Sequence, residues 1–261
     1  MIKRTILAAC VAAFALAALP ALAAAEEPKT TNPGDPFLEG VTEGTEFSAT
    51  GGERKLTSAI GTIKCKENQV TGGKFFDPET GSLKVVFKVC TSPLGTSCQS
   101  GATSGVIETT TLPFHLKTVA HKNAAGETKH EPGILITPGA GTIKHSNGTE
   151  GTHFYTVECG FVGKIVVGGN GLIGTITKPK EDEEPSNTAT VSFSSTEAGS
   201  ATQTHRFITD HQLETEGKPP VEYDLKASLN GGETKTAALD MAMTITFAGG
   251  MKPILKTTPT P

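Results

Sequence analysis

The chain has 261 residues, with 23 Lys and Arg against 27 Asp and Glu, and a formal net charge of −4. Nucleic acids and anionic membrane surfaces are poor partners for it, because both are bound through Lys/Arg clusters that this sequence lacks. With no Trp and only Tyr155 and Tyr223, the chain also lacks the aromatic platform on which sugar-binding modules usually stack their ligands.

Residues 1–23 have the pattern of a cleavable export signal. Lys3 and Arg4 precede an apolar run at 6–19, and an Ala-Leu-Ala cleavage site follows at 21–23. The apolar run is shorter than the roughly 20 residues that a membrane-spanning helix needs. These features predict a signal peptide rather than a membrane anchor.

A lipoprotein-type box at 7–10 is the competing interpretation of the same segment. Most of the apolar region follows Cys10, whereas lipidation of that cysteine would require it to precede. We therefore expect cleavage after Ala23, or after Ala25 if the Ala-Ala-Ala run at 23–25 is the site, and a secreted or extracytoplasmic protein without a transmembrane segment. Loss of the two basic residues of the signal lowers the net charge from −4 to −6.

Four segments follow from the composition along the chain. We expect a signal peptide at 1–23, a flexible N-terminal segment rich in Pro, Thr and charge at 24–45, a β-domain at 46–250, and a polar C-terminal tail at 251–261. The charged, proline-flanked stretch at 178–187 is either a loop within the β-domain or a sub-division of it. All four cysteines of the mature chain precede this stretch.

Short alternating runs separated by Gly, Asn and Pro predict strands throughout the mature chain. In chain order we expect strands near 56–65, 73–76, 82–90, 104–110, 113–121, 152–159, 163–167, 172–177, 188–194, 203–212, 221–227 and 239–247. Ten or more antiparallel strands need two packed sheets or a closed one to bury their apolar faces. The predicted fold class is all-β, an antiparallel β-sandwich or barrel-like double sheet.

Two hairpins are predicted most directly. The turn sequence at 77–81 joins the strand at 73–76 to the strand at 82–90, in which Leu83, Val85, Phe87 and Val89 share one face. The Asn-Gly-Gly run at 230–232 favours a second hairpin, because Asn and Gly tolerate positive φ. Its return strand places five apolar residues on one face: Leu239, Met241, Met243, Ile245 and Phe247.

Cys65, Cys90, Cys98 and Cys159 form an even set in a chain with an export signal, which predicts two disulfides. Three pairings can be drawn. We favour Cys65–Cys90 with Cys98–Cys159, because a local antiparallel sheet brings the ends of the first pair together. A zinc site is disfavoured by the absence of any Cys-x-x-Cys pair.

Two other patterns suggest a ligand without requiring one. The run Gly-Asn-Gly-Leu-Ile-Gly at 169–174 matches a dinucleotide fingerprint, but β-branched residues and a proline follow it where a helix is needed, so we expect a hairpin turn. His205 and His211 share strand parity near Asp210 and are the candidate metal ligands, although exposed sheet histidines are the simpler interpretation.

No catalytic or cofactor-binding residues are predicted. Ser104 lacks the Gly-x-Ser-x-Gly elbow of a nucleophile, and the acidic cluster at 181–184 is typical of a solvated charged loop. The Asn-Gly-Thr sequon at 147–149 has meaning only in a host that glycosylates such sites.

Several short elements carry a resemblance to known sequences. They are Gly-Thr-Ile-Lys-Cys at 61–65, Val-Phe-Lys-Val-Cys at 86–90 followed by Cys98, Gly-Val-Ile-Glu-Thr at 105–109, Glu-Cys-Gly at 158–160, Gly-Leu-Ile-Gly at 171–174 and the stretch 225–232. The chain resembles a group of uncharacterised exported bacterial β-proteins that are rich in Thr and Gly and contain disulfides. The resemblance implies a shared turn at 169–174 and transfers no catalytic residue.

These observations predict an exported, disulfide-stapled, non-catalytic β-domain without a cofactor. It would act as a binding or envelope-associated module of unknown ligand, with a cell-envelope or extracellular component as partner. The alternative is a secreted hydrolase whose active site is assembled only in three dimensions, because a fold by itself does not decide function.

Overall fold

The computed structural model describes residues 35–122, 128–139, 142–144, 150–177, 186–197, 199–209 and 220–257. The chain divides into two compact units, residues 1–30 and 31–261, and every described residue belongs to the second. The predicted signal peptide therefore lies outside the described residues. No helix within the described ranges is both long and apolar enough to cross a membrane.

The second unit is built almost entirely of strands. They are β1 (Pro36–Glu39), β2 (Glu46–Gly51), β3 (Arg54–Ser58), β4 (Gly61–Phe75), β5 (Thr80–Thr91), β6 (Ile107–Glu108), β7 (Leu112–Lys122), β8 (Thr128–Ile136), β9 (Thr142–Lys144), β10 (Glu150–Glu158), β11 (Lys164–Gly169), β12 (Leu172–Thr177), β13 (Thr188–Phe193), β14 (Phe207–Thr209), β15 (Val221–Glu222), β16 (Leu225–Leu229), β17 (Lys235–Phe247) and β18 (Ile254–Thr257). Two short 3₁₀ turns, η1 (Gly160–Val162) and η2 (Ala248–Gly250), interrupt them. Every pairing between named strands is antiparallel, so the predicted all-β class is confirmed.

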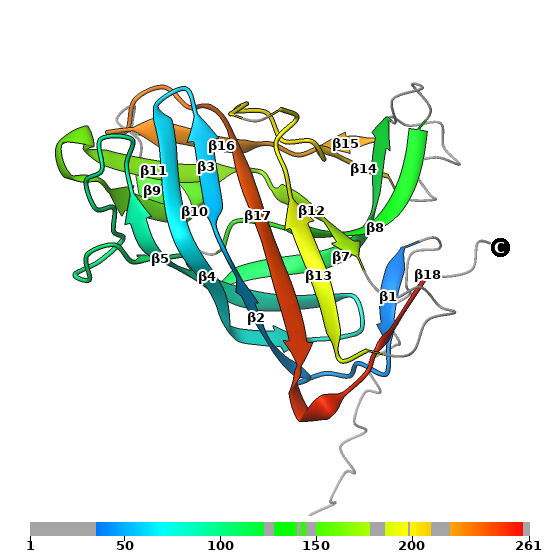
Figure 1. The fold of residues 1–261 in the computed structure, drawn as a ribbon. Helices are drawn as coiled ribbons and strands as arrows, with labels where there is room; N and C mark the ends of the chain where they lie inside the picture. Colours follow the sequence, from blue (N-terminus) through cyan, green and yellow to red (C-terminus); the bar gives the residue numbers. More distant parts are fainter. Residues whose placement is uncertain are drawn as a thin grey trace, which may run out of the picture. The chain divides into compact units, whose positions relative to one another are not determined.

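Eight of the strands close on themselves, and we call this circuit the main ring (Figure 1). Its order is β13, β12, β8, β7, β5, β4, β2 and β17, and β17 pairs back with β13. The closing ladder joins Thr188–Phe193 to Met241–Thr246 over six residue pairs. Closure removes the open edges that would expose unpaired backbone groups.

A second group of strands, which we call the stapled side, branches from the main ring. It consists of β3, β16, β11, β10, the segment 91–111 and the adjoining ends of β4 (61–68), β5 (85–91) and β17 (235–240). The return from β10 to β5 is irregular: Gln99 and Glu158 exchange backbone hydrogen bonds, and the Thr110 amide donates to the Phe154 carbonyl. The β6 strand then pairs with β5.

One continuous apolar core fills both parts. In the main ring, four phenylalanines pack ring against ring, with centroids 5.1–6.2 Å apart: Phe47, Phe75, Phe114 and Phe247. The same core continues to Cys65, Phe87 and Val157 on the stapled side. A small separate cluster, formed by Val119, Leu135, Ile173 and Ile208, packs outside the main ring.

The ends of the described chain differ from their sequence-based assignment. Pro36–Glu39 and Ile254–Thr257, expected in a flexible segment and a polar tail, pair as β1 and β18. Lys256 Nζ adds an ion pair to Glu39 at 2.9 Å. Isolated short runs such as these carry too little periodicity to be recognised, and only their mutual pairing makes them strands.

The predicted strand at 56–65 is also corrected, because it is two strands of a hairpin. Arg54–Ser58 and Gly61–Phe75 pair around a turn at Ala59 and Ile60. The stretch at 178–185 lies outside the described residues, but the strands on either side of it, β12 and β13, pair directly with each other. The stretch 178–187 therefore connects two neighbouring strands of one sheet.

The last hairpin follows the prediction closely. Asn230 and Gly231 both have positive φ, at 51° and 73°, between β16 and β17. Along β17, Leu239, Met241 and Met243 are buried. The alternation predicted for β5 is right for Leu83, Val85 and Phe87 but wrong for Val89.

Val89 has a φ of 53° and an exposed side chain, 49% accessible. A positive φ is rare for a β-branched residue. Beyond it the inward-facing set shifts by one residue, so that Cys90 rather than Val89 is buried. The facing strand makes the same shift between Cys65 and Asn68, and this brings Cys65 directly opposite Cys90.

Candidate functional site

Two interior cavities among the described residues are too small for a ligand. One cavity of ≈ 30 Å³ lies inside the main ring among Phe47, Phe75 and Phe114, and another of ≈ 20 Å³ lies between Phe87, Tyr155 and Leu225. Such volumes accommodate one or two water molecules, whereas small-molecule sites usually measure about 300–1,000 Å³. Neither of these two cavities is a candidate ligand site.

A surface pocket of ≈ 220 Å³ lies on the outer face of β11 and β16, and we call it the outer-sheet pocket. Its lining residues are Thr152, Val166, Gly168, Gly169, Lys226, Ser228 and Thr234. Strand alternation explains this set, because Leu225 and Ala227 point into the core and leave their neighbours on the opposite face.

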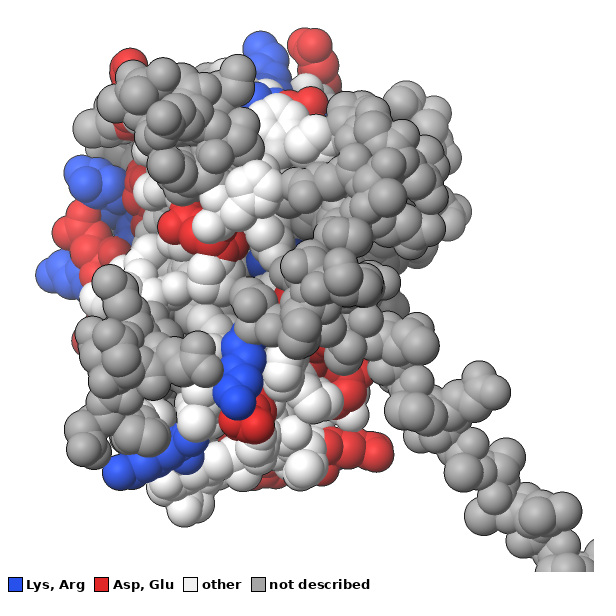
Figure 2. Space-filling view, turned by 90° about the vertical axis from the view of Figure 1, so that its right-hand side faces the viewer, with Lys and Arg blue, Asp and Glu red and all other residues white. Residues whose placement is uncertain are grey.

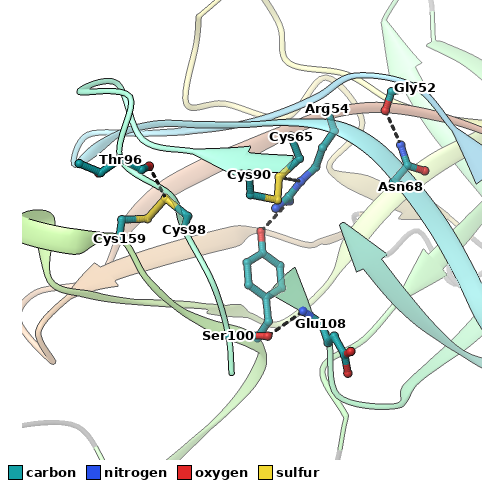
Figure 3. The surroundings of a disulfide bond; sticks show 11 residues. Gly52, Arg54, Cys65, Asn68, Cys90, Thr96, Cys98, Ser100, Glu108 and Cys159 are labelled. Carbon is teal, nitrogen blue, oxygen red and sulfur yellow. Dashed lines mark hydrogen bonds between the residues drawn. A yellow bond between two sulfur atoms is a disulfide. The ribbon is translucent and has the colours of Figure 1, made fainter. Parts of the chain in front are cut away.

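Two disulfides hold the stapled side together (Figure 3). The structure joins Cys65 to Cys90 and Cys98 to Cys159, which is the pairing that the sequence favours. All four cysteines are buried. The Cys98 amide also donates to the Cys90 carbonyl at 2.9 Å, so the two disulfides are linked through the backbone.

Arg54 is the unexpected residue beside these disulfides. It is 0% exposed, and its guanidinium carbon lies 3.4 Å from the centroid of the Phe87 ring. Nε donates to Cys65 Sγ at 3.2 Å and Nη1 donates to the Tyr155 hydroxyl at 3.0 Å, while Nη2 has no hydrogen-bond partner. No described carboxylate forms an ion pair with it, so a cation–π contact and two hydrogen bonds must offset its burial.

Beyond the Cys98–Cys159 disulfide the chain projects an apolar tip, which we define as residues 92–96 and 160–162. Phe161 is 97% exposed and Leu94 is 75% exposed. The two loops touch each other, since a Cβ on Gly160 would lie 3.3 Å from the Thr96 side chain. Neither loop contains a charged residue.

Hydrogen bonds within the apolar tip fix its conformation. The Ser92 and Thr96 hydroxyls are 2.6 Å apart, and the Ser92 amide donates to the Thr96 carbonyl. In the other loop the Val162 amide donates to the Cys159 carbonyl. Phe161 therefore projects from a turn that is closed by both a disulfide and hydrogen bonds.

Of the two candidate metal ligands, His205 and His211, only His205 lies within the described residues. His205 is nearly buried, with Nδ1 3.7 Å from Glu131 Oε1. His211 and Asp210 lie outside the described residues. Within the described ranges, no group of three or more His, Cys, Asp or Glu side chains is arranged to hold a metal ion.

A cluster of titratable groups lies where the β4–β5 turn meets β7 and the start of β1. Lys117 Nζ pairs with the buried Asp35 carboxylate at 2.5 Å. Burial raises the pKa of Glu79, repulsion from Asp35 and Asp77 adds to this, and Lys117 opposes it. Glu79 Oε1 is buried and accepts no hydrogen bond.

The pKa of His115, which lies next to the same cluster, is shifted in the opposite direction. Burial lowers the pKa of His115, and the nearby Lys117 charge lowers it further. The cluster lines none of the three cavities described above. Its contacts tie β1, the β4–β5 turn and β7 together: the Leu38 amide donates to the Pro78 carbonyl and the Leu116 amide to the Glu79 carbonyl.

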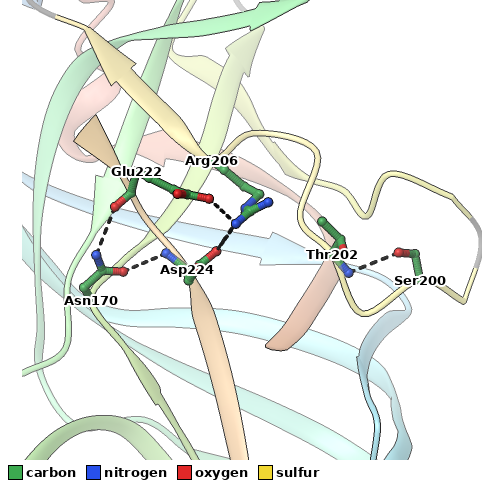
Figure 4. A network of polar contacts seen from close by, with 6 residues as sticks. All are labelled: Asn170, Ser200, Thr202, Arg206, Glu222 and Asp224. Carbon is green, nitrogen blue, oxygen red and sulfur yellow. Dashed lines mark hydrogen bonds and ion pairs between the residues drawn. The ribbon is translucent and has the colours of Figure 1, made fainter. Parts of the chain in front are cut away.

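The run at 169–174 is a turn between β11 and β12, but the predicted hairpin is wrong. β11 pairs with β10 and β16, whereas β12 pairs with β8 and β13, so the turn leads from one group of strands to another. Gly169 has a φ of 118°, and a Cβ there would lie 2.0 Å from the Asp224 carbonyl oxygen. The Asn170 side chain donates to the Glu222 carbonyl and accepts from the Asp224 amide (Figure 4). Arg206 binds both the Glu222 and Asp224 carboxylates. These contacts give the run a structural role.

The surface around β1 and β18 shows no concentrated charge. Figure 2 views this side, and acidic and basic side chains are interspersed over its described part. An interspersed surface of this kind favours solubility rather than attraction of a highly charged partner.

Comparison with protein-family models, with curated proteins and with solved structures finds no match to this chain. The fold and the staples therefore define its class: a disulfide-stapled, all-β domain. Three notable residues were missed by sequence reasoning: Arg54, Phe161 and Ser228. Arg54 stands between Glu53 and Lys55, so its burial had no local signal, whereas the uncharged Cys-Gly-Phe-Val-Gly run at 159–163 could have indicated an exposed turn.

Proposed function

We propose that the chain is an exported, non-catalytic binding module that contacts a protein of the cell envelope or extracellular space through its apolar tip. The observation that carries this proposal is Phe161, a fully projecting aromatic side chain on a turn closed by the Cys98–Cys159 disulfide. Pre-ordered aromatic anchors are the residues that contribute most to protein–protein binding, because little conformational entropy is lost when they are buried.

A protein partner is favoured over a lipid surface on energetic grounds. Burying Phe161 and Leu94 would contribute about 3–6 kcal/mol together. Stable membrane anchoring needs more apolar area or a basic patch, and the apolar tip has no charged residue. A protein pocket adds the contacts of the surrounding loops to the same two anchors.

The hydrolase alternative finds less support in the described residues. None of the three cavities is lined by two titratable side chains, and the carboxyl cluster around Lys117 lies outside all of them. Glycoside hydrolysis, for example, usually needs a pair of carboxyl groups that flank the scissile bond.

Retention of the purified mature chain by cell envelopes tests the proposal. Phe161→Ser should weaken retention about tenfold or more, since truncation of an anchor residue typically costs at least 2 kcal/mol. Phe76→Ser, which changes a half-exposed phenylalanine in the β4–β5 turn, is the matched control and should bind like the parent. Both variants should keep the parental melting temperature.

Two further arms identify the partner. Protease treatment of the envelopes should abolish retention if the partner is a protein. Phe161-dependent binding to protein-free phosphatidylcholine–phosphatidylglycerol vesicles would replace the protein partner by a lipid surface. Equal retention of the parent and Phe161→Ser would refute the apolar tip as the binding surface.

A further inference from the structure

The outer-sheet pocket contains a buried hydroxyl that has no partner. Ser228 is 1% exposed, and its Oγ forms no hydrogen bond. A buried hydroxyl without a partner costs free energy that an alanine would not, so natural structures rarely keep one without a reason. The Ser228 side chain lines the pocket, so a ligand there could supply the missing hydrogen bond.

A cation lies next to this hydroxyl on the same face of the strand. Lys226 precedes Ser228 by two residues in β16, lines the pocket and is exposed. It forms no ion pair with any described residue. Across the ladder, Gly168 is the residue paired with Lys226, and it lines the same pocket without a side chain.

The remaining lining residues add polar groups but no negative charge to the pocket. Thr152 and Thr234 contribute two further hydroxyls, and no carboxylate lines the pocket. No aromatic ring lines it either, which disfavours stacking of a neutral sugar. The volume of ≈ 220 Å³ is below the usual range for drug-sized ligands, so it suits a small molecule.

We propose that the outer-sheet pocket binds the carboxylate or phosphate group of a small anionic molecule. The Lys226 ammonium and the Ser228 hydroxyl donate hydrogen bonds to the same oxyanion, and charge-assisted bonds of this kind are stronger than neutral ones. This site is separate from the apolar tip and does not depend on the function proposed above.

Titration of the mature chain with sodium acetate and with inorganic phosphate tests the site. Amide chemical shifts of β11 and β16 are followed at constant ionic strength set with sodium chloride. At least one probe should give saturable shifts centred on Lys226 and Ser228, and the probe that does so identifies the carboxylate or phosphate class. Shifts that never saturate, or that spread over unrelated lysines, would overturn the proposal.

Three variants make the test specific. Lys226→Gln should weaken binding of the active probe at least tenfold, and Ser228→Ala should weaken it severalfold. Lys235→Gln, an exposed lysine of β17 that does not line the pocket, should bind like the parent. Unchanged binding in Lys226→Gln would refute the site. Ser228→Ala should melt no lower than the parent, so that its weaker binding cannot be ascribed to unfolding.

Discussion

The main ring and the stapled side are closed by different kinds of contact. The main ring closes through a ladder of six residue pairs and is filled by four packed phenylalanines, without a disulfide. The stapled side closes through the irregular segment 91–111, with a single bridge between Gln99 and Glu158, and it holds both disulfides. The Cys98–Cys159 disulfide thus lies where strand pairing is incomplete, whereas Cys65–Cys90 joins two residues that are already paired in the β4–β5 ladder.

All four cysteines of the β-domain precede residue 160, but the later strands do not form a separate half. β16 and β17 complete the stapled side, and β17 is at the same time a strand of the main ring. The disulfides therefore reinforce one end of a shared sheet. A disulfide stabilises mainly by restricting the unfolded chain, so its benefit reaches every strand that unfolds with it.

Among the substitutions that test this comparison, removal of the disulfide that closes the longer loop should lower the unfolding free energy most. The Cys98→Ala/Cys159→Ala double variant loses a link across 61 residues, which corresponds to about 4 kcal/mol of unfolding free energy in the loop-entropy model. Chemical denaturation measures the loss. Hydrogen exchange should show β10 and residues 160–163 losing protection before β2 and β13. Simultaneous loss of protection in all of them would show that the two parts unfold as one.

Substitution of Arg54 should separate packing from charge on the stapled side. Arg54→Ala should lower the unfolding free energy by about 3 kcal/mol, because it empties the space beneath Phe87. Arg54→Met fills that space and removes a buried charge that has no carboxylate partner, so it should stay within about 1 kcal/mol of the parent. Denaturation of the two variants measures both values. If Arg54→Ala and Arg54→Met lost the same amount of unfolding free energy, the stabilisation would instead come from the guanidinium hydrogen bonds.

Substitution of Glu79, which lies in the β4–β5 turn of the main ring, should change the stability least. The pKa of Glu79 is raised above its ordinary value of 4.5, so its ionised form is disfavoured in the folded state. The stability linked to this group is fully present below pH 4.5 and is lost as the pH rises through the raised pKa. Glu79→Gln should therefore raise the melting temperature at pH 7, with a gain that disappears towards pH 4.

Asp77→Asn is the informative comparison for Glu79. It removes a repulsive charge that acts on Glu79, but it also weakens the turn. The Asn oxygen can still accept from the Glu79 and Thr80 amides at Oδ1, whereas the Thr80 hydroxyl loses its acceptor at Oδ2. Melting curves between pH 4 and 8 measure the two variants side by side. A pH-independent gain in Glu79→Gln would mean that the raised pKa is not its cause.

Local features of the fold could be predicted because they depend on neighbouring residues. The turn at Asn230 and Gly231 needs positive φ, and the alternation along β17 reports burial on one face of a strand. At 169–174 the β-branched residues that follow the glycines correctly indicated a strand instead of a helix, although the expected hairpin does not form. These patterns depend on the chain over fewer than ten or so residues, which is the range over which sequence periodicity can be recognised.

The candidate sites could not be predicted in the same way. Phe161 is an apolar residue of the kind usually found in a core, but it is exposed on the 3₁₀ turn that follows Cys159. Ser228 stands in an ordinary strand sequence, and its missing partner is evident only when the facing strand is known. Arg54 lies in a charged run, and its burial depends on Phe87 and Tyr155, which are distant in the chain.

The sequence by itself determined the all-β class, the positions of most strands and the number of cysteines available for disulfides. Only the tertiary structure decided that β13 and β17 close the main ring, that Val89 and Cys90 exchange inner and outer positions, and that a lysine and a buried serine share a pocket. The physical reason is the range of the interactions. Strand periodicity is local, whereas closure, burial of a charge and convergence of polar groups arise from contacts between residues far apart in the chain.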